Sequence, residues 1–201
     1  MKKIYFAALL SVLNICSGYS YSYKPGLPVN IYLNSGIFQG KTYYTPSCWQ
    51  GDIMCISYAE TCSNNPNSSP SCIKIDYIFT NQSVMNWIGI NWSFPSYNWG
   101  DIDAGLDLTG ASRVTFFARG EKGQETIAVK FGGNFGLFPD STDVIAGPIT
   151  LTKEWKQYEI PIQEEDLTHI SMGFGLMMFR KDYKNRKLKK ATVYLDDIII
   201  D

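Results

Sequence analysis

The chain has 201 residues, of which 45% are hydrophobic, and its 18 basic and 19 acidic side chains give a net charge of −1. This length fits one domain with a full core, and the near-neutral charge argues against a general nucleic-acid-binding protein. Beyond the amino-terminal segment, no stretch approaches the ~20 apolar residues that a membrane span needs.

The first segment of the chain has the pattern of a secretory signal peptide. Two lysines precede the apolar run Ile4–Ile15, and Cys16 and Gly18 occupy the small-residue positions before a cleavage site. The alternative, a lipoprotein cysteine at Cys16, is disfavoured because an isoleucine precedes it where a small residue is needed. We therefore expect residues 1–18 to be removed and residues 19–201 to form one secreted domain, extracellular or periplasmic, with a net charge near −3.

Four cysteines cluster within 25 residues of that domain: Cys48, Cys55, Cys62 and Cys72. In an exported chain, an even and clustered set indicates two disulfides, and sequence leaves all three pairings open. A zinc site is the alternative, but the spacing lacks the close C-x2-C pairs that are typical of one. The disulfides would staple the loop Asn64–Ser71, which is rich in Asn, Ser and Pro and has little apolar content.

Alternation of apolar and polar residues predicts many short β-strands, separated by turn signals rich in Gly, Pro and Asp. Only Gln163–His169 is expected to be briefly helical. Strands without intervening helices predict an all-β sandwich or barrel. The predicted strands are Cys72–Phe79, Asn86–Trp92, Arg113–Arg119, Glu125–Phe131, Pro148–Thr152, Lys156–Pro161, Ile170–Phe179 and Thr192–Ile200.

One segment between the last two predicted strands is strongly basic. Seven of the 11 residues in Arg180–Lys190 are Lys or Arg. Such a run is typical of a solvated hairpin loop, and the sharper interpretation is a docking patch for an acidic glycan or another anionic surface.

Seven short segments of the chain together indicate a family. They are, in order, Tyr44–Ser47, Trp49–Asp52, Asn98–Asp101, Leu106–Ala111, Phe116–Gly123, Leu151–Tyr158 and Val193–Ile198. In this order they resemble secreted bacterial jelly-roll domains of the galactose-binding-like, carbohydrate-binding-module type, with family 11 modules nearest. The resemblance covers residues 40–201 and implies a jelly-roll β-sandwich that binds glycans.

The chain departs from that family pattern at two single positions. The family tends to have Gly where this chain has Cys48, which fits an added disulfide, and Trp where it has Phe117. The second change removes an aromatic surface that a sugar could contact, and so argues against a sugar site inherited unchanged from the family.

Sugar binding requires flat aromatic faces and planar polar groups, because a pyranose ring has an apolar C–H face and adjacent hydroxyls. The aromatic-rich stretch 87–101 supplies candidates in Trp92, Tyr97 and Trp99. Period-two alternation places Ile88, Ile90 and Trp92 on one face, so Trp92 faces the core if the isoleucines do.

Four further residues complete the predicted binding site. Arg119 and Lys130 are expected to line a shared groove on a polar sheet face, although solvent-facing charges are the plainer interpretation. Trp49 and Asp52, beside the cysteine cluster, are expected to close one end of this groove.

The last predicted strand contains a candidate metal ligand. The resemblance implies a structural calcium held by Asp196 together with backbone carbonyls near Asn30–Ser35, since calcium prefers several oxygen ligands. The alternative is that Asp196 and Asp197 are edge-strand charges that prevent aggregation.

Catalytic signals are weak. The only histidine is His169, expected to be a surface or packing residue, and no G-x-S-x-G, H-E-x-x-H, P-loop or Rossmann motif occurs. The sequence therefore predicts a secreted, monomeric, non-catalytic protein that binds a polysaccharide or glycoconjugate. The alternatives are an effector or adhesin-like interaction module without sugar binding, and a small hydrolase using two carboxylates.

Overall fold

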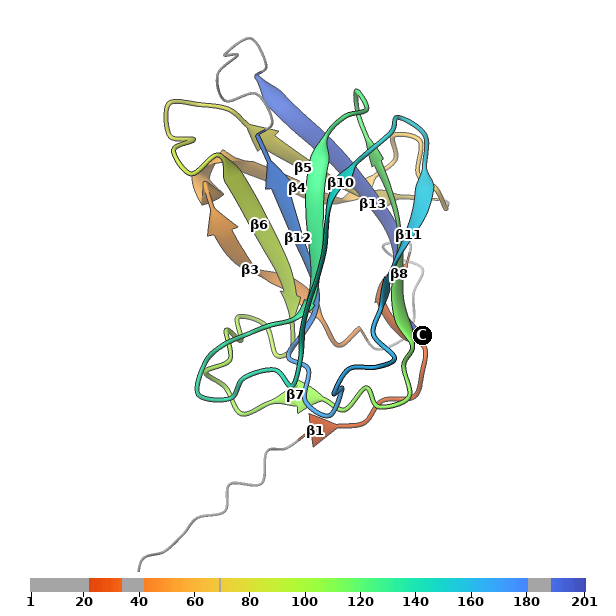
Figure 1. The fold of residues 1–201 in the computed structure, drawn as a ribbon. Helices are drawn as coiled ribbons and strands as arrows, with labels where there is room; N and C mark the ends of the chain where they lie inside the picture. Colours follow the sequence, from red (N-terminus) through yellow and green to blue (C-terminus); the bar gives the residue numbers. More distant parts are fainter. Residues whose placement is uncertain (1–21, 34–41, 69, 181–188) are drawn as a thin grey trace, which may run out of the picture.

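The computed structural model describes residues 22–33, 42–68, 70–180 and 189–201, and two antiparallel sheets face each other in it (Figure 1). The predicted signal peptide and most of the basic segment lie outside the described residues. The elements are β1 (Ser22–Tyr23), β2 (Val29–Tyr32), β3 (Thr45–Gly51), the 3₁₀ turn η1 (Ile53–Cys55), β4 (Ile56–Cys62), β5 (Cys72–Ile78), β6 (Trp87–Ser93), β7 (Gly105–Leu106), β8 (Arg113–Gly120), β9 (Thr126–Gly132), β10 (Asp143–Thr150), β11 (Lys156–Pro161), β12 (Met172–Phe179) and β13 (Lys190–Ile200).

Strands distant in the sequence lie side by side in both sheets. One sheet has five strands in the order β10-β9-β12-β6-β3, and the other has the order β11-β8-β13-β5-β4, with β2 also pairing with β13. A short parallel pair, β1 and β7, closes the lower end of the sandwich (Figure 1). The predicted all-β sandwich is therefore confirmed.

The core lies between the sheets, and period-two alternation explains which side chains enter it. Ile88, Ile90 and Trp92 of β6 point inward, as the sequence pattern predicts. The rings of Trp92 and Phe116 each lie 5.4 Å from the Phe174 ring, centroid to centroid, in edge-on contacts. Trp92 and Phe174 lie on neighbouring strands of the five-stranded sheet, whereas Phe116 belongs to the other sheet, so the contact between Phe116 and Phe174 joins the two layers.

All eight predicted strands are present, but one has the wrong start. β10 begins at Asp143 rather than at Pro148, because its pairing with β9 shifts register between Ala146 and Ile149 and continues past the proline. A proline inside a strand is tolerated at a sheet edge, where β10 lies.

The predicted helix at Gln163–His169 is wrong. This segment consists of turns and bends. The Asp166 carboxylate accepts hydrogen bonds from the backbone N–H and hydroxyl of Thr168, at 3.0 and 2.6 Å, and this local pattern competes with helix formation. Within the described ranges, no helix has the length and apolar character needed to cross a membrane.

The predicted disulfides are also wrong, since all four cysteines of the cluster are free thiols. They lie in different layers: Cys48 belongs to the five-stranded sheet, whereas Cys62 and Cys72 face each other across β4 and β5 of the other sheet. Cys55 contacts the hydroxyl of Thr80 at 3.3 Å. Burial and the neighbouring Cys62 raise the pKa of the Cys72 thiol to about 12.

Candidate functional site

The outer face of the five-stranded sheet carries an open groove. Because alternate residues of each strand point inward to the core, Asn91 of β6, Gly175 of β12 and Lys130 of β9 all point outward. The groove has a volume of about 440 Å³. Its lining residues are Gln50, Asn91, Trp99, Lys130, Gly133, Asn134, Phe135, Ile145, Met172, Gly175 and Met177.

The floor of the groove is open because its central residues are small. A Cβ atom added at Gly175 would lie 3.0 Å from Oδ1 of Asn91 and 3.3 Å from Cβ of Lys130. A Cβ at Gly89, on the neighbouring strand, would lie 3.2 Å from the Trp87 ring. Larger residues at these positions would fill the space in which a ligand can lie.

Two amide side chains of the floor have unused hydrogen-bonding capacity. Asn91 is only 6% exposed, and its side-chain amide has no hydrogen-bond partner within the described residues. The same holds for the amide of the partly exposed Gln50 on the adjacent strand β3. Because both amides line the groove and make no hydrogen bond within the described residues, they are available to donate to and accept from the hydroxyl groups of a ligand.

Lys130 is the charged member of the floor. Its ammonium group lies 3.0 Å from a carboxylate oxygen of Asp143 on β10 and 5.8 Å from the ring centroid of Phe135. The carboxylate neutralises much of this charge, so the groove is polar without a strong net charge.

One end of the groove is walled by the segment between β6 and β7, which Asn98 organises. Asn98 is fully buried, and its amide nitrogen donates to the carbonyls of Phe94, Ile102 and Ala104 at 3.0–3.2 Å. Its amide oxygen accepts from the Gly100 N–H at 2.8 Å. This network fixes the turn that presents Trp99.

A second segment, between β9 and β10, completes the wall and is fixed by Asn134 and Asp140. The Asn134 amide donates to the Asn98 carbonyl at 3.1 Å and to the Ser171 hydroxyl at 2.8 Å. The Asp140 carboxylate accepts from the backbone N–H groups of Asn134, Ser171 and Met172. The two segments are thus tied to each other and to the start of β12.

The two wall segments meet at a pair of glycines. Gly100 has φ +91°, which favours glycine, and its carbonyl accepts the Phe138 N–H at 2.8 Å. A Cβ at Gly136 would collide with the Gly100 carbonyl oxygen. Only glycine at position 136 therefore allows this close approach.

Aromatic rings project from this wall. Trp99 is 42% exposed and Phe135 is 77% exposed, and both line the groove. Exposing an apolar ring to water is unfavourable, so a ligand that covers the ring is bound more favourably. Rigidly presented, exposed rings beside unpartnered amides are the combination that a pyranose ring needs.

Two of the seven predicted binding residues, Trp99 and Lys130, line this groove. Tyr97 lies two residues from Trp99, is exposed, and has φ +66°, but it does not line the groove. The prediction for Trp92 is wrong, since it is 1% exposed and belongs to the core. Trp49 also faces inward, where its ring packs edge-on against Tyr58 at 5.4 Å between centroids.

Asp52 holds a turn and does not close the groove, so this prediction is wrong. Its carboxylate accepts hydrogen bonds from the backbone N–H groups of Val84, Met85 and Asn86 at 2.9–3.0 Å, and from the Tyr77 hydroxyl at 2.5 Å. Burial and this hydrogen bond raise the pKa of Tyr77.

Arg119 does not share a groove with Lys130, because β8 belongs to the opposite sheet. It is buried, its guanidinium lies 3.7 Å from the Tyr194 ring centroid and 5.2 Å from that of Trp155, and it donates to the Asn64 carbonyl at 2.8 Å. Phe117, where the family tends to have Trp, also belongs to β8 and is therefore remote from the groove.

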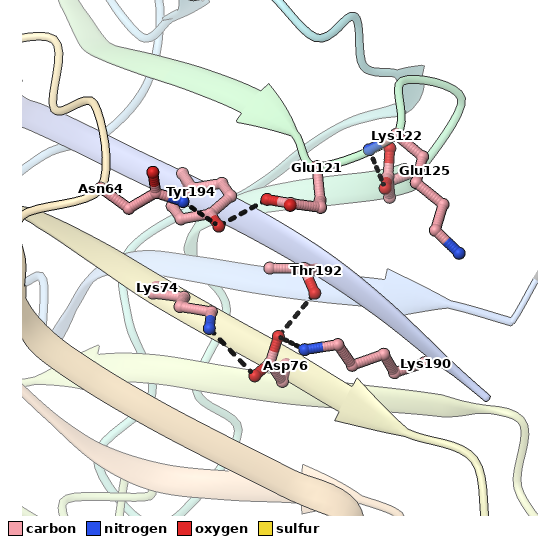
Figure 2. Close-up of polar contacts among 9 residues, drawn as sticks. All are labelled: Asn64, Lys74, Asp76, Glu121, Lys122, Glu125, Lys190, Thr192 and Tyr194. Carbon is pink, nitrogen blue, oxygen red and sulfur yellow. Dashed lines mark hydrogen bonds and ion pairs between the residues drawn. The ribbon is translucent and has the colours of Figure 1, made fainter.

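The outer face of the six-stranded sheet is occupied by its own polar contacts (Figure 2). The Tyr194 hydroxyl donates to Glu121 at 2.5 Å and accepts from Asn64 at 3.1 Å. Burial, followed by the bond to Glu121, raises the pKa of Tyr194 to about 12. Nearby, Asp76 is paired with Lys74 and Lys190 at 3.5 and 3.2 Å.

The surroundings of Asp196 do not fit a calcium ion. Its carboxylate accepts the backbone N–H groups of Asn67, Ser68 and Asp197 at 2.9–3.0 Å, and N–H groups repel a cation. Of the predicted carbonyl partners, part of Asn30–Ser35 lies outside the described residues. No cluster of three or more His, Cys, Asp or Glu side chains suited to a metal occurs in the described part of the chain. The calcium stays a prediction.

Sequence reasoning missed most of the floor and half of the aromatic wall. Asn91 and Gln50 carry no motif, and only the alternation within β6 indicates that Asn91 faces away from the core. Phe135 lies in a segment rich in glycine, for which no strand was predicted. The single histidine, His169, forms a hydrogen bond of 3.1 Å with the Ser22 hydroxyl and lies against Gly105. It does not line the groove.

Comparison with known proteins identifies the fold. No protein-family model matches the chain, and no curated protein sequence does either. A family 30 carbohydrate-binding module superposes with a TM-score of 0.59 at 16% identity, covering 87% of each chain. The family 30 module of a cellulosomal cellulase from Clostridium thermocellum gives 0.57 at 13% identity, covering 87% of this chain and 97% of that one. A family 11 module from the same organism gives only 0.47 at 14% identity, covering 81% and 91%, which is too low for a structural argument. The chain therefore has the jelly-roll β-sandwich fold of carbohydrate-binding modules.

Proposed function

We propose that this chain is a secreted, non-catalytic protein that binds a polysaccharide in the groove of its five-stranded sheet. One observation carries the proposal: the side-chain amide of Asn91 has no hydrogen-bond partner within the described residues and lies on a groove floor beside the exposed rings of Trp99 and Phe135. The likeness to family 30 carbohydrate-binding modules supports it at the level of the fold.

The chemistry of the groove suits a neutral sugar. Trp99 and Phe135 supply apolar faces that cover pyranose C–H groups, and the amides of Asn91 and Gln50 can donate to and accept from neighbouring hydroxyls. Since Asp143 neutralises Lys130, the groove has no unbalanced charge to attract an acidic glycan. We therefore propose a neutral polysaccharide as the ligand.

A non-catalytic role is supported by what lines the groove. Glycoside hydrolysis needs two carboxyl groups on opposite sides of the scissile bond. Among the described residues that line the groove there is no Asp, Glu or His, and the nearby Asp143 is held by Lys130. Secretion is supported by the sequence pattern of residues 1–18, and a polysaccharide ligand is most accessible outside the cell.

Isothermal titration calorimetry with a panel of soluble glucans, mannans and galactans tests the proposal. Trp99→Ala is expected to weaken binding by about tenfold or more, since an aromatic contact contributes roughly 1–2 kcal/mol. Asn91→Ala is expected to weaken binding similarly while leaving the melting temperature almost unchanged, because its amide makes no hydrogen bond within the described protein. Trp155→Ala, just before β11 of the opposite sheet, is the matched control and is expected to bind like the parent.

Two outcomes would contradict the proposal. Absence of binding to every glycan at about millimolar concentration would leave the interaction module as the better explanation, because such an affinity corresponds to only ~4 kcal/mol. Binding that is unchanged in both Trp99→Ala and Asn91→Ala would move the sugar site elsewhere on the molecule.

A further inference from the structure

Four exposed aliphatic side chains gather at the end of the sandwich remote from the groove wall. Ile53 and Met54 belong to η1, and Val84 and Met85 belong to the segment between β5 and β6. Each is between 51% and 78% exposed. We call these four residues the apolar tip. Figure 1 shows the segment between β5 and β6 at the upper end of the molecule, whereas the segments that wall the groove lie at the lower end.

The apolar tip is rigidly built. The Asp52 carboxylate binds the backbone N–H groups of Val84 and Met85 at 3.0 and 2.9 Å, and the Asp52 carbonyl accepts the Cys55 N–H at 2.8 Å. Cys55 in turn contacts the Ser83 hydroxyl at 3.3 Å. One buried carboxylate thus joins both turns and fixes four apolar side chains in solvent, which is unfavourable unless they meet a partner.

Basic residues border the tip. The Arg180 N–H donates to the Asn86 carbonyl at 3.0 Å, and its guanidinium lies 4.6 Å from the Phe79 ring centroid. The Phe79 N–H donates to the Lys189 carbonyl at 2.8 Å. Lys190 is already paired with Asp76, so Arg180 and Lys189 supply the unbalanced charge within the described residues.

We propose that the apolar tip docks on a bilayer that contains anionic lipids. Aliphatic side chains carried on two turns can enter the headgroup region, and adjacent Lys and Arg side chains are attracted by the negative surface potential. This surface is separate from the groove, so glycan binding and lipid binding are independent properties of the molecule.

Vesicle co-sedimentation of the full secreted chain tests the proposal, with phosphatidylcholine containing about 30% phosphatidylserine compared with phosphatidylcholine alone. We expect binding to the anionic vesicles to be at least about tenfold stronger, and to fall as salt rises from about 0.1 to about 0.5 M. The double variant Met54→Ser/Val84→Ser is expected to lower the partition coefficient by about tenfold or more, because it removes buried apolar area at the interface.

Two matched controls separate docking from general stickiness. Leu137→Ser removes an equally exposed aliphatic side chain at the other end of the molecule, and Lys24→Gln removes a charge there. Both are expected to bind vesicles like the parent, whereas Lys189→Gln should weaken binding by about fivefold.

Equal binding to neutral and anionic vesicles, no binding to either, or a double variant that binds like the parent would each overturn the proposal. The glycan titration is run on the same samples. A parent chain that binds glycan but binds neither kind of vesicle would refute the membrane proposal alone.

Discussion

A carboxylate inside a protein has to be matched by donors, and Asp52 shows how far one such residue can organise its surroundings. It is buried and accepts three backbone N–H groups and one hydroxyl. From the sequence alone, such an aspartate fits a ligand-binding role as well as a structural one. Its geometry shows that the oxygens are already used within the protein, so its contribution is to stability and to the shape of the apolar tip.

Asp52→Ala is expected to lower the free energy of unfolding by roughly 2–4 kcal/mol, since several buried donors lose their partner at once. Urea denaturation measures this change. Asp52→Asn keeps one acceptor oxygen and should lose less. Glu164→Ala removes an exposed carboxylate that has no partner within the described residues, and should change stability by no more than about 0.5 kcal/mol. A variant Asp52→Ala as stable as the parent would show that water replaces the carboxylate without cost.

Single residues were predicted well where their direction follows from the strand, and poorly where it depends on packing between sheets. Alternation along β6 already indicated that Trp92 is buried if Ile88 and Ile90 are, and the structure places it there. Arg119 and Lys130 are both outward-facing on their strands, but the sequence does not say that β8 and β9 belong to different sheets. Long-range pairing therefore decides which outward residues share a surface.

At the scale of elements, the groove depends on two irregular segments that no periodicity describes. The segments 94–104 and 133–142 pack against each other through Gly100 and Gly136, and Asn98, Asn134 and Asp140 satisfy their backbone groups. Loops with buried, satisfied polar groups are rigid, and rigid loops present a binding ring at low entropic cost.

Gly136→Ala is expected to weaken glycan binding by about tenfold although residue 136 does not line the groove, because the added methyl pushes the two wall segments apart. Calorimetry measures the affinity, and thermal melting should show only a modest loss. Gly26→Ala is the control, since a methyl there meets nothing within 4 Å. Unchanged affinity in Gly136→Ala would mean that the wall does not position the binding rings.

The strands themselves were largely predictable, and the failures have local causes. Clear alternation identified β5, β6, β8, β9, β11, β12 and β13 to within two residues at each end. β3 and β4 were not predicted, and β10 was truncated because Pro148 sits beside its bulge. The charged segment Gln163–His169 was predicted to be helical, but it contains a turn in which the Asp166 carboxylate accepts the Thr168 N–H.

At the scale of the whole molecule, the two sheets have opposite roles. The segment after β4 lies over the outer face of the six-stranded sheet, where Arg119 donates to the Asn64 carbonyl and Trp155 to the Asn65 carbonyl, both at 2.8 Å. That face is therefore covered by the chain itself. The five-stranded sheet keeps its outer face open between walls, and the groove lies on that face.

Both layers also bury tyrosine hydroxyls, and this predicts how the molecule responds to alkali. Burial raises the pKa of Tyr44, Tyr58 and Tyr77, and raises that of Tyr194 to about 12, above the ordinary value near 10. The folded state therefore holds these protons when the unfolded chain has released them. The stability that these hydroxyls contribute is complete below about pH 10 and is lost as pH rises through about 10 to 12 and beyond.

We expect tyrosinate absorbance from these residues to rise in one cooperative step with the loss of far-ultraviolet circular dichroism. Tyr97→Phe, which removes an exposed hydroxyl, should leave the transition in place. Gradual ionisation of every tyrosine with the sheet signal intact would show that the buried hydroxyls are accessible to solvent, and that the core is looser than its packing indicates.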